Sequence, residues 1–285
     1  MMQDIVVLSS EIGDRNLARP AALESAATFI EGRFASCGYA SVRRQEFSVG
    51  TAGVRNLEVV LPGSVRPDEF FVVGAHYDTA EGAPGADDNA SGVAALLELA
   101  CTFAARPAER SLVFVAYTNE EPPYFQTDAM GSVVHATDLA NRGVNMLGML
   151  SLESIGYYDA ATGSQHYPFP LGGYYPKEGD FLTFVGNRRS KQLLFSAITT
   201  FREAAFLPSE GGTAPHWLRG IGWSDHWAYW QHGVQAIMVT DTAVFRNPHY
   251  HEPTDTVQAI DAVRLTLAVD GIEHVVRDLA LARPE

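Results

Sequence analysis

Two kinds of hydrophobic pattern alternate along the chain and predict a layered structure. Short apolar runs rich in β-branched residues predict strands at residues 70–74, 112–117, 147–152 and 236–240. Apolar residues at helical spacing predict helices at residues 21–34, 93–105, 224–231 and 260–281. Strands that alternate with helices are typical of a mainly parallel sheet covered by helices, so we expect an α/β fold.

Polar side chains able to bind a ligand follow each of the four predicted strands. They are His76 and Asp78, then Glu120 and Glu121, then Glu153 and, after a longer loop, His251. In open α/β sheets, binding sites form where the carboxyl ends of strands meet. We therefore expect these side chains to converge on one site.

The segment VVGAHYDTAEGAPGADDNASG, residues 72–92, carries one histidine and four acids but no lysine or arginine. Two of its residues belong to a candidate ligand set. The set consists of His76, Asp88, Glu121, Glu153 and His251. Two imidazoles and three carboxylates suit zinc, or other borderline ions such as cobalt and manganese. Three carboxylates repel one another in a cleft. Two divalent cations, about 3.5–4 Å apart and bridged by a carboxylate, would cancel that repulsion.

The adjacent acids Glu120 and Glu121 could have two different roles, metal binding and proton transfer. Neighbouring side chains on an extended segment point to opposite sides. One carboxylate can therefore bind metal while the other accepts a proton from a metal-bound water. We prefer Glu121 as the ligand and Glu120 as the general base, although spacing does not decide between them.

Each of these signals also has a purely structural interpretation. The Glu120–Glu121 pair could be a solvated loop, and Asp87, Asp88 and Asn89 could cap the following helix together with Ser91. Further structural alternatives are a turn role for His251, competition from His249, and an ion pair between Glu153 and an arginine. The coincidence of all these residues at strand ends favours a common site.

Composition narrows the classes of partner. The 285 residues are 46% hydrophobic, enough for a large core, and we expect one catalytic domain over residues 1–285. Lys and Arg number 20 against 34 Asp and Glu, a formal charge of −14. Such a surface repels phosphate backbones and anionic lipid, so we expect neither nucleic acid nor membrane partners. The acid excess also has a simpler explanation, solubility.

Two further expectations concern the location of the protein. No apolar run approaches the ~18 residues of a membrane span, and the N-terminal residues do not resemble a secretory signal. We expect a cytoplasmic location, with secretion left open.

Cys37 and Cys101 fall in helix-like segments, and we expect buried thiols there, not a disulfide scaffold.

The order of motifs matches a known family. The chain contains, in this order, GAHYD, GADDNASGVAALLELA, NEEPP, LESIGYY, SDHWAYW and NPHYHEPTDT. It resembles the co-catalytic zinc aminopeptidases of metallopeptidase family twenty-eight, whose relatives include glutaminyl cyclases and glutamate carboxypeptidases. The resemblance extends from about Leu23 to the last predicted helix. It implies a three-layer αβα sandwich with a mixed, mainly parallel central sheet.

The resemblance also implies roles for individual residues. They are His76 on one zinc ion, Asp88 as the bridge, Glu121 and His251 on the other ion, an acid at 153, and Glu120 as general base. Asp78 would hold His76 in place, and Asp87 would be solvated or capping. Asp225 and His226 would contact the substrate amine or the developing oxyanion. Ser224 or Asp225 could also cap the predicted helix at residues 224–231. A cap role would explain Asp225 equally well.

One position departs from the family pattern, because many members carry aspartate where this chain has Glu153. The longer side chain could alter the first metal site, which leaves a single zinc ion possible. We expect a zinc aminopeptidase that removes N-terminal residues from peptides through a metal-bound hydroxide. The alternatives are glutaminyl-peptide cyclisation by a single zinc ion and an inactive binding protein of the same fold. A peptide or small aminoacyl substrate is expected in the first two cases.

Other enzyme classes lack their motifs in this sequence. There is no G-x-S-x-G elbow, no P-loop and no dinucleotide fingerprint. Aromatic residues crowd residues 156–181, and some of them could wall an apolar pocket, with residues 122–125 as the other wall. The sequence does not reveal the preferred substrate side chain, the physiological substrate or the oligomeric state.

Overall fold

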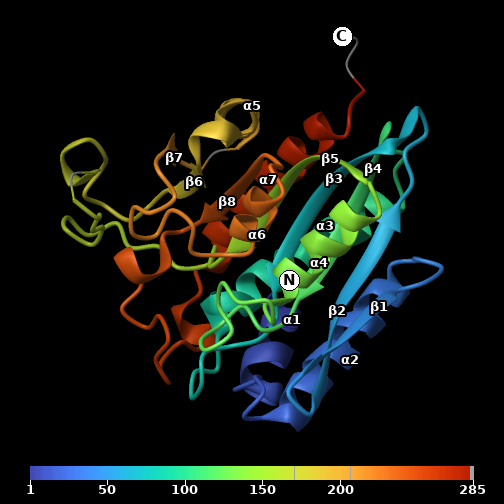
Figure 1. Ribbon diagram of the computed structural model, residues 1–285. Helices are drawn as coiled ribbons and strands as arrows, with labels where there is room; N and C mark the ends of the chain where they lie inside the picture. The colour runs from blue at the N-terminus through green and yellow to red at the C-terminus, as the bar shows by residue number, and fades with distance from the viewer. Residues whose placement is uncertain (170, 206, 283–285) are drawn as a thin grey trace.

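A single mixed β-sheet organises the protein. The structure is a computed structural model that describes residues 1–169, 171–205 and 207–282 (Figure 1). The strand order is β1-β2-β4-β3-β5-β8-β6-β7. The strands are β1 (Arg43–Val49), β2 (Ala52–Leu61), β3 (Arg66–His76), β4 (Arg110–Tyr117), β5 (Asn145–Glu153), β6 (Leu182–Gly186), β7 (Ser209–Thr213) and β8 (Ala236–Thr240). Strands β4, β3, β5 and β8 run parallel, while β1 with β2, β2 with β4, and β6 with β8 are antiparallel.

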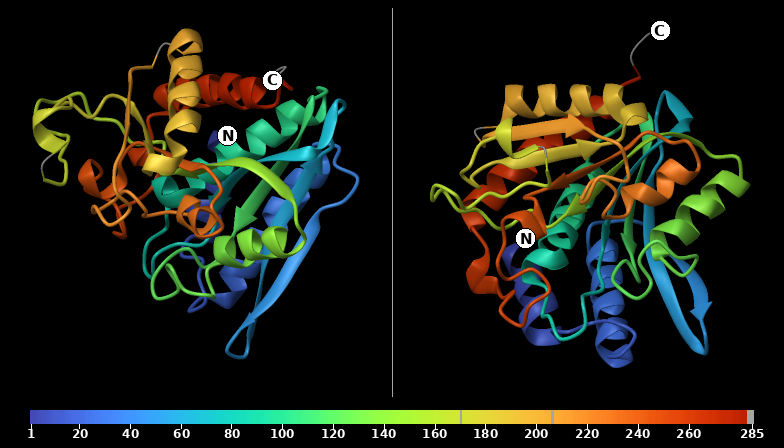
Figure 2. Two further views of the ribbon diagram at one scale, coloured as in Figure 1. Left: turned by 45° about the horizontal axis from the view of Figure 1, so that its top comes forward. Right: turned by 60° about the vertical axis from the view of Figure 1, so that its left-hand side comes forward.

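Helices cover both faces of the sheet (Figure 2). They are α1 (Met2–Val6), α2 (Pro20–Ser36), α3 (Gly92–Ala104), α4 (Gly131–Asn141), α5 (Lys191–Ala204), α6 (His226–Gln231) and α7 (Ala262–Leu279). Helices α2, α3, α5 and α7 contribute to the larger hydrophobic core, whereas α4 and α6 pack in a second core on the opposite face. This arrangement confirms the predicted αβα sandwich with a mixed sheet.

Strand β3 shows why the central strands are apolar on both sides. Phe71, Val73 and Ala75 face the larger core, and Val72 faces the second one. Successive side chains of a strand point to opposite faces, so a strand covered by helices on both faces must be apolar at almost every position. The buried run of β3 ends at His76, which places a polar ring at the carboxyl end of the sheet.

The predicted elements are all present, with ends that differ by up to four residues from the predicted ones. Strand β8 matches its prediction, and α7 begins after Asp261, whose carboxylate accepts bonds from the Val263 and Arg264 N–H groups. The sequence analysis did not identify strands β1, β2, β6 and β7 or helices α1, α4 and α5. In β1 only Gln45 and none of the apolar side chains is buried, so this strand has no hydrophobic pattern to detect.

The prediction for the two cysteines is wrong. Cys37, at the end of α2, and Cys101, in α3, form a disulfide and are half-buried. Helices α2 and α3 pack side by side, which brings the two sulfur atoms together although 64 residues separate them.

No helix within the described residues is long and apolar enough to cross a membrane. The cytoplasmic location stays a prediction.

Candidate metal centre

His76 is oriented by the residue two positions after it. Its Nδ1 lies 3.1 Å from the backbone oxygen of Asp78 and its Nε2 faces a group of acids. A carbonyl oxygen can only accept a hydrogen bond, so Nδ1 carries the proton. Because Nδ1 makes this bond, Nε2 is the nitrogen left to bind a metal ion, and a ligating histidine held in this way is typical of metal sites.

The carboxylate of Asp78 has a second role. Its two oxygens accept hydrogen bonds from the backbone N–H groups of Glu120 and Glu121, each at 3.1 Å. Asp78 therefore links the end of β3 to the turn after β4 and fixes the backbone of both acids. It is almost fully buried, and its backbone oxygen, not its carboxylate, makes the hydrogen bond to His76. Its role in holding His76 stays a prediction.

Asp88 lies between two histidines. Its Oδ1 is 3.3 Å from Nε2 of His76, and its Oδ2 is 3.1 Å from Nε2 of His251. The backbone here is held from another part of the chain, because the carboxylate of Asp255 accepts bonds from the N–H groups of Asp87 and Asp88. Each oxygen of Asp88 thus faces a different imidazole, the arrangement that a bridging carboxylate needs.

Two sets of donor atoms share Asp88. One set contains His76, Asp88 and Glu153, and the other contains Asp88, Glu121 and His251. Glu153 lies 3.2 Å from Nε2 of His76, and Glu121 lies 3.1 Å from Nε2 of His251. Ligand atoms on a tetrahedral zinc ion at 2.0–2.1 Å are about 3.3 Å apart, so both sets have the spacing of zinc ligands.

The unpaired atoms of the cluster test whether a metal fits. Among the described residues, four buried atoms of the two sets have no hydrogen-bond partner: His76 Nε2, Asp88 Oδ1, Glu121 Oε1 and His251 Nε2. Buried polar atoms are almost always satisfied, and those that are not require an explanation. Bound zinc ions would satisfy these nitrogen and oxygen donors together, so the residues fit the metal.

The charges of the cluster lead to the same conclusion. Burial lowers the pKa of His251, but Asp88 and Glu121 outweigh this and raise it to about 10. Burial and the neighbouring Asp88 raise the pKa of Glu121 to about 8. Protonated imidazoles and a protonated acid are how a metal-free cluster limits its repulsion. Divalent cations would remove the need for these protons.

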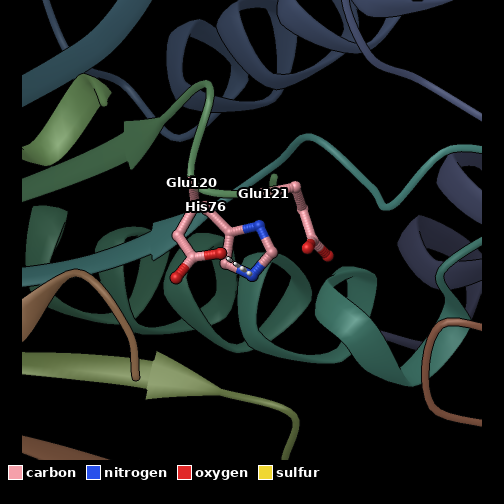
Figure 3. Close-up of side chains that lie close together, drawn as sticks. All are labelled: His76, Glu120 and Glu121. Carbon is pink, nitrogen blue, oxygen red and sulfur yellow. Dashed lines mark ion pairs between the residues drawn. The ribbon is translucent and has the colours of Figure 1, made fainter. Parts of the chain in front are cut away.

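Glu120 stands apart from both sets. Its Oε2 lies 4.0 Å from Nε2 of His76, and it joins only a looser group with His76 and Glu121. Figure 3 shows its carboxylate on one side of the His76 ring and that of Glu121 on the other. Burial raises the pKa of Glu120 well above its usual value, and Glu153 and Glu121 add to this, while His76 opposes it. A buried carboxylate with a raised pKa beside the metal ligands suits proton transfer.

Several structural alternatives are wrong. Glu153 accepts hydrogen bonds from the hydroxyls of Ser154 and Ser224 and has no ion pair with an arginine among the described residues. Asp87 is not solvated, because it is fully buried and accepts bonds from the Gly156 N–H and the Asn247 amide. His249 contacts the hydroxyl of Thr254 and belongs to neither set of donor atoms. Asn89, in place of Asp88, accepts the bond from the Gly92 N–H at the start of α3.

Asp225 and His226 lie at the start of α6, both fully buried. The Asp225 side chain makes no capping bond, which removes the structural explanation for it. Burial raises the pKa of Asp225 to about 7, with Glu153 and Asp78 also raising it and His76 opposing. His226 donates from Nε2 to the carbonyl of Ile221, and burial lowers its pKa to about 4. Their contact with a substrate stays a prediction.

Sequence reasoning missed two supporting residues. Asp255 fixes the backbone of Asp87 and Asp88 through both of its oxygens. Ser224 donates a hydrogen bond to Glu153 across 71 positions of sequence and also bonds the hydroxyl of Ser151. Asp255 belongs to the NPHYHEPTDT motif, so its motif was noted but its role was not. Nothing in the local pattern signals the role of Ser224.

An apolar pocket of about 110 Å³ lies over the strands next to β5. Its floor is formed by β6, β7 and β8, where Thr183, Glu210 and Thr240 are neighbours across three strands. Thr240 is in turn paired with Glu153 of β5, so the metal centre and the pocket floor share one row of the sheet. The walls include Tyr167, Leu171, Tyr175, Phe181, Ile221 and Phe245. Part of the predicted aromatic region therefore does line a pocket.

Comparison with known proteins decides the family. The model of peptidase family M28 matches residues 56–276 of the chain. The chain belongs to peptidase family M28. The uncharacterized protein YfbL of Escherichia coli strain K12 is 39% identical over 259 residues, covering 88% of this chain and 78% of that protein. A probable zinc metalloprotease of Pyricularia oryzae is 37% identical over 120 residues, which cover 39% of this chain and only 22% of the relative.

Solved structures of other proteins share the fold. BSAP, a zinc aminopeptidase from Bacillus subtilis, superposes with a TM-score of 0.79 at 15% identity, over 98% of this chain and 94% of that one. Fimbriiglobus ruber glutaminyl cyclase gives a TM-score of 0.68 at 20% identity, over 97% and 93% of the two chains. At these identities the likeness establishes the fold alone. Family membership confirms the predicted resemblance and makes the protein a zinc peptidase, without fixing the number of ions.

Proposed function

We propose that this M28 peptidase is an aminopeptidase that holds two zinc ions and removes N-terminal residues from peptides. The observation that carries the proposal is the position of Asp88, with one oxygen toward His76 and the other toward His251. His76, Asp88 and Glu153 would hold one ion, and Asp88, Glu121 and His251 the other. Glu153, although longer than aspartate, reaches the same donor set, which supports two ions over one.

Glu120 is the general base and acid of the proposed reaction. Zinc held by the two sets of donors would polarise the scissile carbonyl and would lower the pKa of a water molecule, so that the water could lose a proton near neutral pH. The Glu120 carboxylate accepts the proton of that water, and the resulting carboxylic acid then protonates the leaving amine. Asp78 keeps Glu120 in place through the bond from its backbone N–H. The raised pKa of the buried Glu120 favours the protonated acid that the second step needs.

The apolar pocket supports a preference at the N-terminal residue of the peptide. It continues the row that starts at Glu153, so a peptide whose amine lies at the metal centre would direct its first side chain into it. Walls formed by Phe181, Ile221 and Phe245 suit a large apolar side chain. The physiological peptide is left open.

Substitution of Glu120 tests the mechanism. We expect Glu120→Gln to lower kcat by a factor of about 10²–10⁴ because the amide cannot accept the proton, while zinc content stays at the wild-type value. Turnover of a leucine-led peptide and zinc content by mass spectrometry are the measurements. Glu81→Gln, which changes an exposed acid of the loop before Asp88, is the matched control and should retain full activity. Retention of most activity in Glu120→Gln would disprove the assigned role.

A peptide pool separates aminopeptidase from cyclase. Zinc-loaded protein is incubated with peptides that carry free, acetylated or glutamine-led N-termini, and the products are followed by mass spectrometry. Stepwise loss of N-terminal residues from free peptides alone is the expected result. Ammonia loss confined to glutamine-led peptides would instead identify a glutaminyl cyclase. No change in any peptide would point to a binding protein.

A further inference from the structure

A fully buried arginine lies behind the metal centre. Arg15 has no exposed surface and is located between α1 and α2, outside the residues matched by the family model. A buried guanidinium is uncommon because its desolvation is expensive unless its N–H groups are satisfied. Burial lowers the pKa of Arg15 to about 10 even though Asp255, Asp78 and Asp88 raise it, so the side chain stays charged at neutral pH.

The guanidinium of Arg15 binds the backbone of the loop that follows β3. Its Nε donates to the carbonyl of Tyr77 at 2.7 Å, Nη1 to that of Pro84 at 2.7 Å and Nη2 to that of Gly85 at 3.0 Å. Nη1 also donates to the carbonyls of Leu8 and Gly13. Every nitrogen of the planar fork is therefore used, and the two ends of the loop are held by one rigid group.

Neighbours of Arg15 extend this contact along the loop. The Arg15 N–H donates to the hydroxyl of Thr79 at 3.0 Å, and the Thr79 N–H donates back to the Arg15 carbonyl at 3.2 Å. Asn16 donates to the Thr79 carbonyl, and Asp14 accepts from the Gly82 N–H. The segment 14–16 thus binds the loop on both sides of Thr79.

The loop held in this way connects two predicted metal ligands, His76 and Asp88, along the chain. His76 comes one residue before Tyr77, and Asp88 follows three residues after Gly85. Gly85 adopts a φ of +62°, and a Cβ there would meet the Asp88 carbonyl oxygen at 2.3 Å. The loop is therefore tightly packed against Asp88, and a shift of its backbone would move one ligand relative to the other.

We propose that Arg15 is a positioning residue of the zinc centre, whose guanidinium fixes the loop Tyr77–Gly85 so that His76 and Asp88 stand at ligand spacing before zinc binds. This rests on the proposed assignment of His76 and Asp88 as zinc ligands. Arg15 also adds positive charge close to Asp78 and Asp88, which limits the repulsion within the cluster of acids. It contacts neither zinc nor substrate in this scheme.

The affinity for zinc, measured by competition with a chromogenic chelator, tests the proposal. Arg15→Lys keeps the charge but loses the fork. We expect its zinc dissociation constant to rise 10–100-fold, the usual effect of losing a residue that supports metal ligands. The matched control is Arg33→Lys, which breaks a two-bond pair with Asp4 in the same N-terminal region. It should lower the melting temperature without changing the affinity for zinc.

Two outcomes would overturn the proposal. One is an unchanged zinc affinity in Arg15→Lys, which would make Arg15 a structural brace only; the other is an equal loss of affinity in Arg33→Lys. If Arg15→Lys does not fold, Thr79→Val loosens the same junction more gently, and unchanged zinc affinity there would also overturn it. Asp88→Asn in the same titration separates the two proposals, since undiminished zinc binding by that variant would disprove the ligand assignment itself.

Discussion

Glu153 is the residue at which the chain departs from the pattern that its motifs follow. Its Oε1 accepts a bond from Ser154 at 3.0 Å, and its Oε2 accepts one from Ser224 at 2.8 Å while lying 3.2 Å from Nε2 of His76. The surrounding hydroxyls are therefore placed for the longer side chain. Replacing Glu153 with aspartate would therefore disturb these hydrogen bonds.

Glu153→Asp should weaken the zinc site that it shares with His76. Loss of one methylene withdraws the carboxylate by about 1.5 Å, too far for it to keep both serine bonds and its place beside His76. We expect at least a tenfold lower zinc affinity at one of two sites, measured by chelator competition and metal content. Ser224→Ala, which removes one of the two bonds, should have a smaller effect. Unchanged affinity in Glu153→Asp would show that the hydroxyls do not set the geometry.

Residue types and their positions after strands were enough to predict that the side chains of the candidate ligand set lie close together. His76, Glu121 and Glu153 each follow a strongly apolar strand, where the sheet itself dictates that side chains meet. The roles of Asp87 and Asp255 could not be predicted in this way. Both depend on bonds between parts of the chain more than 60 residues apart, and no local pattern records such a bond.

At the scale of elements, a buried chain of polar groups fixes α4 and α6 against the sheet. Glu58 of β2 lies 2.7 Å from Nε2 of His135 in α4, and Nδ1 of His135 lies 2.7 Å from the hydroxyl of Tyr229 in α6. That hydroxyl in turn contacts the hydroxyl of Tyr117 in β4 at 2.7 Å. Arg43 of β1 reaches Glu58 from the rim at 3.1 Å.

Glu58→Gln should destabilise the protein at neutral pH. Burial raises the pKa of Glu58, but His135 and Arg43 outweigh it and hold the pKa below its usual value. A lowered pKa in the folded state means that stability is present above about pH 4.3, the unfolded value, and is lost as the pH falls through the folded value. We expect a loss of about 3 kcal/mol at pH 7 that shrinks below about pH 4, measured by urea unfolding.

The control for this prediction is an acid with an exposed ion pair. Glu24 pairs with Arg55 at 2.7 Å, but its side chain is 60% exposed. Glu24→Gln should therefore cost less than about 1 kcal/mol at either pH. Equal losses in the two variants would show that the buried chain of polar groups contributes no more than a surface pair.

The central strands, which are buried on both faces, were predictable, whereas β2, β6, α4 and α5 were missed although each of them buries some apolar side chains. Strands β3, β4 and β5 are apolar on both sides, and α3 is buried along most of its length. Strand β7 reads SEGGT and lies at the edge of the sheet, so its sequence lacks any hydrophobic period. Its place in the sheet comes from pairing with β6, which is a tertiary contact.

At the scale of the whole molecule, metal removal should affect stability as well as activity. A thousandfold excess of free zinc over its dissociation constant stabilises the folded state by about 4 kcal/mol. At roughly 2–4 °C per kcal/mol for a chain of this size, chelation should lower the melting temperature by roughly ten degrees. Zinc should restore it, whereas magnesium should not, because magnesium prefers oxygen donors and avoids imidazole. Identical melting curves with and without chelator would contradict a zinc site in this cluster.

The donors of the two sets are spread from His76 to His251 and depend on the ends of separate strands. An unfolded chain must close long loops to bring these donors together, and this closure costs entropy. We therefore expect zinc to bind after the sheet has formed. In that case zinc should slow unfolding and leave the rate of folding unaltered.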